Sequence, residues 1–136
     1  EFIMNASHSL GKRGSVWSTM AYSFQKPADT KGEISKYISN QSNRQFMFNT
    51  RYSGQRLGLS MNGTYRQRNP AYAEALNLTL SSEYWLFGIQ ADYGIIFQKL
   101  FIELRVENLF NTRYSDVLGA ELPGRWITGG IRYKKK

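Results

Sequence analysis

The sequence predicts an all-β fold: an antiparallel up-and-down transmembrane β-barrel, of which this chain supplies about seven strands. Three observations predict this fold. Apolar and polar residues alternate one by one along most of the chain, which is the pattern of strands with two unlike faces. The connections between these segments are alternately short and long, as in bacterial outer-membrane barrels. The chain has no run of about 18 apolar residues, the length that a transmembrane helix requires.

Composition agrees with strands that cross a membrane. The chain has 136 residues, 41% of them hydrophobic and 15% aromatic, and its mean hydropathy is −0.49. A transmembrane strand has only about 9–11 residues, and only half of them need to be apolar, so a negative mean hydropathy is compatible with insertion. The absence of cysteine and the single histidine exclude disulfides, thiolate metal sites and histidine-cluster metal sites.

Seven segments carry the alternating pattern. The clearest pair is joined by the short turn at residues 54–56. The N-terminal pair is joined by residues 11–14, where Gly11 and Gly14 suit a turn with positive φ. The expected strands are residues 1–10, 15–25, 44–53, 57–67, 83–95, 100–107 and 125–134.

The long connections are polar and lie on one side of the expected sheet. They cover residues 26–43, 68–82 and 109–124, and residues 71–78 within the second favour a short helical turn. A further short turn is expected around residues 97–99. Short periplasmic turns and longer extracellular loops are typical of outer-membrane barrels. We therefore expect the C-terminus on the short-turn side.

Alternation gives each strand an apolar face and a polar face. Charged side chains recur on the polar face, where a dry core would not tolerate them, so this face is expected to line a polar lumen. The residues expected to face the lumen are Arg51, Asn62, Arg66, Asp92, Glu103, Arg105 and Arg132. Aromatic residues near strand ends predict belts at two membrane interfaces. These residues are Tyr22, Phe24, Tyr52, Tyr65, Trp85, Tyr93, Trp126 and Tyr133.

Two motifs near the C-terminus resemble those of a known family. A V-x-N-L-F-N-x-x-Y segment ends the sixth expected strand, and a P-G-R triplet opens the last one. The matching residues are Val106, Asn108, Leu109, Phe110, Asn111, Tyr114, Pro123, Gly124 and Arg125. In this order and spacing, the block resembles the C-terminal end of TonB-dependent outer-membrane receptors. The match covers roughly the last quarter of the chain.

The resemblance implies a transporter of the bacterial outer membrane with a periplasmic C-terminus. It implies a barrel of roughly 22 strands, with residues 1–136 forming the C-terminal part of that single domain. The implied partners are the N-terminal remainder of the barrel with its plug, the TonB complex acting through the plug, and the lipid bilayer. The implied activity is import of a scarce, large solute. Residues 114–119, before the P-G-R triplet, resemble the cobalamin, siderophore and haem receptors of the family, and cobalamin is the preferred solute.

About seven strands cannot close a bacterial barrel, which has an even number of strands. An open edge in lipid would leave unpaired N–H and C=O groups, each costing several kcal/mol. We therefore expect the strands of this chain to pair with others, whether the chain arises from a nicked protein, a split gene or a fragment.

No pattern of catalytic or cofactor-binding residues is present, so the chain is not expected to be an enzyme or to hold a cofactor. Solute selection is expected in the long loops and at their rim, because binding residues concentrate on loops held by rigid scaffolds. The candidates are Tyr37, Arg68, Tyr72, Tyr84 and Trp85. The charged side chains that face the lumen are expected to be solvated or to contact the plug.

Three alternatives remain open. A net charge of +8 suggests nucleic-acid binding as one alternative. The basic residues do not share one patterned face, however, so no nucleic-acid partner is expected. The chain could instead be a small autonomous outer-membrane barrel, an adhesin or structural protein, or a soluble β-sandwich that binds a ligand. The basic residues of the short turns are expected to be solvated. The alternative is that they contact anionic lipid headgroups or acidic periplasmic partners.

Overall fold

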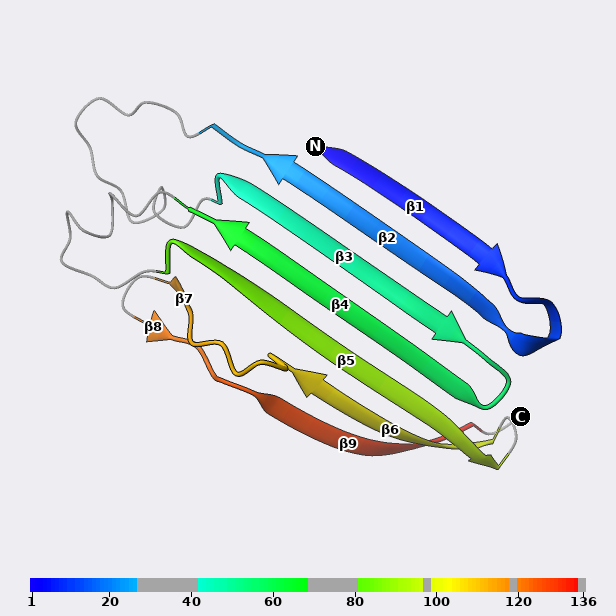
Figure 1. Ribbon diagram of the computed structural model, residues 1–136. Coiled ribbons are helices and arrows are strands. Elements are labelled where there is room, and N and C mark those ends of the chain that lie inside the picture. The colour runs from blue at the N-terminus through cyan, green and yellow to red at the C-terminus, as the bar shows by residue number, and fades with distance from the viewer. Residues whose placement is uncertain (27–41, 69–80, 97–98, 118–119, 135–136) are drawn as a thin grey trace, which may run out of the picture.

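The computed structural model describes residues 1–26, 42–68, 81–96, 99–117 and 120–134. These residues form one twisted antiparallel sheet of seven strands in the order β1-β2-β3-β4-β5-β6-β9 (Figure 1). A second, two-stranded sheet pairs β7 with β8 at the end of the molecule where the long connections lie. No helix among these residues is long and apolar enough to cross a membrane.

The strand bounds follow the predicted segments closely. A single turn of 3-10 helix, η1 (Gly11–Arg13), joins the first two strands, and Gly11 and Gly14 have the positive φ values expected, 62° and 128°. The strands of the large sheet are β1 (Phe2–Ser9), β2 (Ser15–Phe24), β3 (Arg44–Ser53), β4 (Leu57–Gln67), β5 (Glu83–Ile96), β6 (Leu100–Glu107) and β9 (Trp126–Tyr133).

The third long connection contains structure that the sequence did not predict. Within residues 109–124, expected to be a loop, β7 (Ser115–Val117) and β8 (Ala120–Glu121) form a short hairpin. The expected helical turn at residues 71–78 and the expected turn residues 97–98 lie outside the described residues.

The register places the apolar positions of all seven strands on one face. Across β2, β3 and β4, Tyr22 is opposite Phe46, and Phe46 is opposite Tyr65. The same alignment continues to Trp85 on β5. At the other side of the sheet, Ile102 on β6 is opposite both Tyr93 and Ile131. A shift of one residue in any pairing would move the apolar side chains of that strand to the other face. The observed register therefore agrees with the alternation of apolar and polar residues.

Nothing in the described part of the chain covers the apolar face. Leu59 is 41% exposed and Met61 is 45% exposed, although both are apolar residues on a central strand of the sheet. A soluble β-sandwich would bury such residues beneath a second sheet at about 10 Å. The described residues therefore form a single layer, and the two layers expected of a sandwich are not present among them.

The sheet is open. Strands β1 and β9 are its edges, and the described residues supply no further strand beside either one. Neighbouring strands are antiparallel, so the first and seventh strands of the row run in the same direction. One local irregularity occurs between Gly94 and Ile96, where the β5–β6 register shifts.

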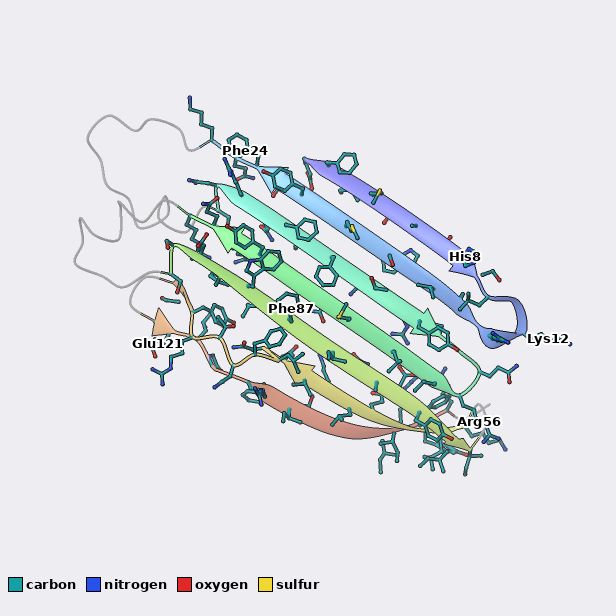
Figure 2. The ribbon with its side chains drawn as sticks, in the orientation of Figure 1. His8, Lys12, Phe24, Arg56, Phe87 and Glu121 are labelled. Carbon is teal, nitrogen blue, oxygen red and sulfur yellow. The ribbon has the colours of Figure 1, made fainter. Side chains whose placement is uncertain are left out.

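The aromatic residues predicted to form belts lie toward both ends of the apolar face, with one exception. Near the long connections, the Trp85 ring stacks on Phe87 at 5.7 Å and lies 4.8 Å from Tyr65. Figure 2 labels Phe87 on this part of the sheet. Trp126, predicted to belong to a belt, is paired with Glu107 and lies on the polar face, because the last strand alternates from Ile127 outward.

Candidate functional site

The asparagine-rich motif turns the chain sharply at the end of β6. Asn108 and Asn111 both have positive φ, 49° and 54°, a conformation that asparagine tolerates better than most residues. The Asn108 side chain donates to the Thr112 carbonyl and accepts from the Thr112 N–H, both at 2.8 Å. Asn108 itself is buried. The motif therefore specifies a backbone reversal stabilised by its own side chains.

The second motif is joined to the first by a hydrogen bond. The backbone N–H of Arg125 donates to Asn111 Oδ1 at 2.8 Å. Gly124 lies so close to that oxygen that a Cβ on it would overlap it. The asparagine of one motif thus fixes the start of β9, and the missing Cβ of Gly124 leaves room for its oxygen.

The same turn is attached to β5. The N–H of Leu109 donates to the Phe87 carbonyl at 2.8 Å, and the Phe110 ring meets the Phe87 ring edge-on at 5.2 Å. These contacts extend the β5 ladder beyond the end of β6. The motif residues that the resemblance singled out are therefore a structural joint between three strands, which gives a physical reason for their spacing.

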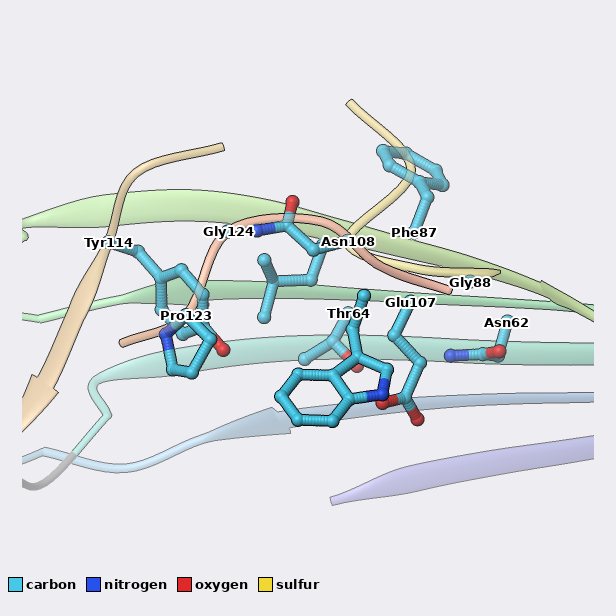
Figure 3. A pocket seen from close by; sticks show the side chains of 11 residues that line it. Asn62, Thr64, Phe87, Gly88, Glu107, Asn108, Tyr114, Pro123 and Gly124 are labelled. Atoms are coloured by element: carbon cyan, nitrogen blue, oxygen red, sulfur yellow. The ribbon is translucent and has the colours of Figure 1, made fainter. Parts of the chain in front are cut away.

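A hollow of about 360 Å³ lies beside this joint on the polar face (Figure 3). Its wall combines polar groups from β4 and β6 with aromatic rings from the segments around β9. Its lining residues are Asn62, Thr64, Leu86, Phe87, Gly88, Glu107, Asn108, Tyr114, Pro123, Gly124 and Trp126. A carboxylate, two side-chain amides and aromatic residues that share a hollow can contact a polar ligand or a polypeptide segment.

A second hollow of about 410 Å³ adjoins the first, since Asn62 and Thr64 line both. Its floor is largely apolar, with Trp17 from β2 and Met47 from β3. Both side chains project from the otherwise polar face and are nearly half exposed. The polar face thus carries two connected depressions with different chemistry.

Ion pairs cross the same face. Arg51 on β3 reaches over β4 to Asp92 on β5, with 3.4 Å between Nη2 and Oδ1. Arg132 on β9 pairs with Glu103 on β6. Gly58 lies beneath the first pair, where a Cβ would overlap the Asp92 carboxylate. Asp92 is among the few buried charged residues, and its partner compensates that burial.

The remaining predicted lumen residues lie on the same face. Arg105 pairs with Glu107 at 2.7 Å along β6. Arg66 lies at the long-connection end of β4 and is half-buried. Together with Asn62, these placements bring all seven predicted residues onto one face of the sheet. Whether that face lines a lumen stays a prediction.

The predicted rim residues do not form one cluster. Arg68 and Tyr84 are both buried, and the Arg68 guanidinium donates to the Tyr84 hydroxyl at 3.3 Å. The Tyr84 ring packs on Tyr114 at 4.8 Å, close to the β7–β8 hairpin. Trp85 lies on the opposite, apolar face. Tyr37 and Tyr72 lie outside the described residues.

Alternation places Trp17 and Met47 on the polar face but marks neither as a contact residue, and the sequence identifies Tyr114 only as a motif residue. The first two break the alternation pattern, since each is apolar at a position where its strand is otherwise polar. That break is a usable signal for a contact surface. The role of Tyr114 depends on a hairpin that joins distant residues, and no local pattern encodes it.

No protein-family model, curated protein or solved structure matches this chain. Among the described residues, no three aspartate, glutamate or histidine side chains gather as a metal site would require.

Proposed function

We propose that this chain is a wall segment of an outer-membrane β-barrel transporter, of the TonB-dependent receptor kind that its C-terminal motifs resemble. In this proposal the apolar face contacts lipid and the polar face lines the lumen. The N-terminal remainder of the barrel pairs with the open edges and supplies the plug. The transporter imports a large, scarce solute across the outer membrane, and the chain itself performs no chemistry.

The observation that carries this proposal is the contrast between the two faces of one sheet. Side chains such as Met61 and Ile89 are apolar and exposed in the middle of the sheet. In water, an uncovered apolar surface of this extent would favour aggregation. Directly behind them, the polar face carries Arg51, Asp92 and their ion pair. Lipid on one side and water on the other accommodate both faces.

The length of the strands fits a bilayer. Strands β3 and β4 have 10 and 11 residues. At about 3.3 Å per residue, such strands span roughly 33–36 Å, and a tilt of about 45° reduces their height to roughly 25 Å. The outward apolar band of outer-membrane barrels is also about 25 Å tall. The aromatic residues near both strand ends would then lie at the two interfaces.

The open edges support partner strands from another part of the protein. Because β1 and β9 run in the same direction, closure of this sheet on itself would create a parallel pair. A head-to-tail ring of copies would create the same parallel pair at every junction. An odd number of additional strands restores antiparallel pairing at both edges and makes the total even, as bacterial barrels require.

The solute is assigned from the resemblance. Residues 114–119, before the P-G-R triplet, resemble the cobalamin, siderophore and haem receptors, and we take cobalamin as the first choice. The first hollow lies next to this segment, with Tyr114 and Trp126 in its wall. Ligand retention by the full-length gene product tests the assignment: co-purified cobalamin supports it, and a co-purified siderophore or haem replaces it.

The three tryptophans test the orientation of the faces directly. Trp85 lies on the apolar face, whereas Trp17 and Trp126 lie on the polar face. Single-tryptophan variants, with phenylalanine at the other two positions, are reconstituted into bilayers that contain brominated acyl chains. We expect quenching of Trp85 by the lipid and quenching of Trp17 and Trp126 by aqueous iodide. Equal lipid quenching at all three positions, or none at any, would contradict the proposal.

A further inference from the structure

Two basic hollows meet at the short-turn end of the sheet, far from the joint described above. They lie on either side of the β3–β4 turn and share Gly54, Gln55, Arg56 and Leu57. Their volumes are about 160 and 430 Å³. Lys12 and Arg56 mark this end of the molecule in Figure 2. The cations that line the two hollows are Lys12, Arg13, Arg51, Arg56, Arg132 and Lys134, and one carboxylate, Asp92, lines them.

The positive charge of these hollows is only partly neutralised within the described residues. Arg51 is paired with Asp92, and Arg132 is paired with Glu103. Lys12, Arg13, Arg56 and Lys134 form no ion pair with any described carboxylate. Cations that converge on a hollow without counter-charges favour an anionic occupant.

The cations are held on a pre-organised frame. The Tyr52 hydroxyl donates to the Arg13 carbonyl at 2.7 Å, and Gln55 Nε2 donates to the Lys12 carbonyl at 3.3 Å. Gly14 lies so close to the Ser53 carbonyl that a Cβ would overlap it. The β1–β2 and β3–β4 turns therefore form one unit, which lowers the entropic cost of binding across them.

A second part of the frame is built around one ring. The Arg132 guanidinium lies 4.8 Å from the centroid of the Phe101 ring, and Lys134 Nζ lies 5.5 Å from it. Both cations belong to the polar face, because Tyr133 between them projects to the apolar face. The ring positions both charges over the smaller hollow.

We propose that the two basic hollows bind an acidic segment of a polypeptide. The segment crosses the β3–β4 turn and places carboxylates in both hollows. A polypeptide fits better than a lipid headgroup, because the two hollows lie on both sides of one turn and share its residues. An extended chain can enter hollows on both sides of one turn, whereas a single phosphate fills one. The inference depends on the geometry of the two basic hollows and does not require the proposed transport function.

The probe is a short labelled peptide in which glutamate alternates with glycine, and its control has glutamine in place of glutamate. Fluorescence anisotropy measures binding to the full chain in a non-ionic detergent at low and high salt. We expect the glutamate peptide to bind and the glutamine peptide not to bind, with affinity falling as salt screens the charges. Arg56→Ala and Lys134→Ala should each weaken binding about tenfold, the loss typical of one charge-assisted hydrogen bond. Arg113→Ala, which removes an exposed cation at the far end of the sheet, should leave binding unchanged.

Charge reversal separates recognition from misfolding. The double variant R56E/K134E should lose affinity for the glutamate peptide while its far-UV circular dichroism spectrum stays that of the folded sheet. Equal affinity of the wild-type chain and the alanine variants for the glutamate peptide would overturn the inference. Binding to phosphatidylglycerol vesicles without binding to the peptide would also overturn it, in favour of a lipid. A chain that binds the peptide yet fails the tryptophan-quenching test would end the transport proposal and leave this one intact.

Discussion

The side-chain oxygen of Asn111 accepts a hydrogen bond at 2.8 Å from the backbone N–H of Arg125, fourteen residues later. This contact closes the third long connection and sets where β9 begins. It joins the two halves of the C-terminal motif pair, so residues that are separate in the sequence act as one structural unit. The position of the last strand, and with it one open edge of the sheet, depends on this joint.

Substitution of Asn111 should therefore destabilise the C-terminal strands in two separable steps. Asn111→Gly keeps the positive φ and loses the hydrogen bond, which should cost about 1 kcal/mol. Asn111→Ala loses the hydrogen bond and also strains the backbone, which should raise the cost to about 2 kcal/mol. Urea unfolding in detergent micelles measures both. Asn49→Ala, an exposed asparagine on β3 with regular strand geometry, is the control and should change little. Equal losses at positions 49 and 111 would contradict this account of the joint.

Glycine substitutions in the first turn should differ in cost although both residues have positive φ. Gly11→Ala should cost about 1 kcal/mol, because it strains the backbone but a Cβ there meets no other atom within 4 Å. Gly14→Ala should cost more, because the new Cβ also overlaps the Ser53 carbonyl and pushes the two short turns apart. Thermal unfolding followed by circular dichroism compares the two variants. A larger loss for Gly11→Ala would refute the close docking of the turns.

Adjacent positions on β4 should respond oppositely to a new charge. Met61 lies on the apolar face and is 45% exposed, and Ser60 lies on the polar face. In a bilayer, Met61→Arg should cost about 2–4 kcal/mol, the usual cost of arginine on the lipid face near the midplane, whereas Ser60→Arg should be nearly neutral. Unfolding in lipid vesicles gives both values. A neutral Met61→Arg variant would show that water, not lipid, covers this face.

The Arg51–Asp92 pair should show measurable coupling in a double-mutant cycle. Asp92 is nearly buried while Arg51 is about half exposed, so we expect a coupling of about 1 kcal/mol rather than the larger value of a fully buried pair. The cycle uses Arg51→Met, Asp92→Asn and the double variant, with unfolding free energies as the readout. A coupling near zero would mean that solvent screens the pair completely.

Substitution of Phe101, the ring beside Arg132 and Lys134, gives a further test of peptide binding at the two basic hollows. Phe101→Leu keeps apolar volume but removes the ring that faces Arg132 and Lys134. We expect stability to fall by about 1 kcal/mol, from the loss of exposed cation–π contacts and some packing. The glutamate-peptide affinity should fall as well, because the two cations lose their fixed positions. Phe2→Leu, an exposed aromatic on edge strand β1, serves as the comparison and should not affect peptide affinity.

Much of the fold was predictable because its determinants are local. A period-2 alternation identifies a strand and its faces from a few neighbouring residues, and a short turn fixes the register of the pair it joins. The bounds of β3 and β4 were predicted as observed, since the turn between them leaves little freedom. The distribution of short and long connections also required only the order of residues along the chain.

The tertiary structure alone decided the contacts between residues that are far apart in the sequence. Arg51 meets Asp92 because β4 brings β3 and β5 together and Gly58 leaves room above it. Tyr84 packs on Tyr114 and Arg68 lies over the Tyr84 ring, so the burial of these two rim candidates depends on contacts that the local pattern does not contain. Trp126 meets Glu107 because β9 pairs with β6, and the hydrogen bond from Arg125 to Asn111 sets where that strand begins. Alternation determines which side of its own strand a side chain occupies, but the neighbour it meets depends on pairing across long connections, which only the folded chain specifies.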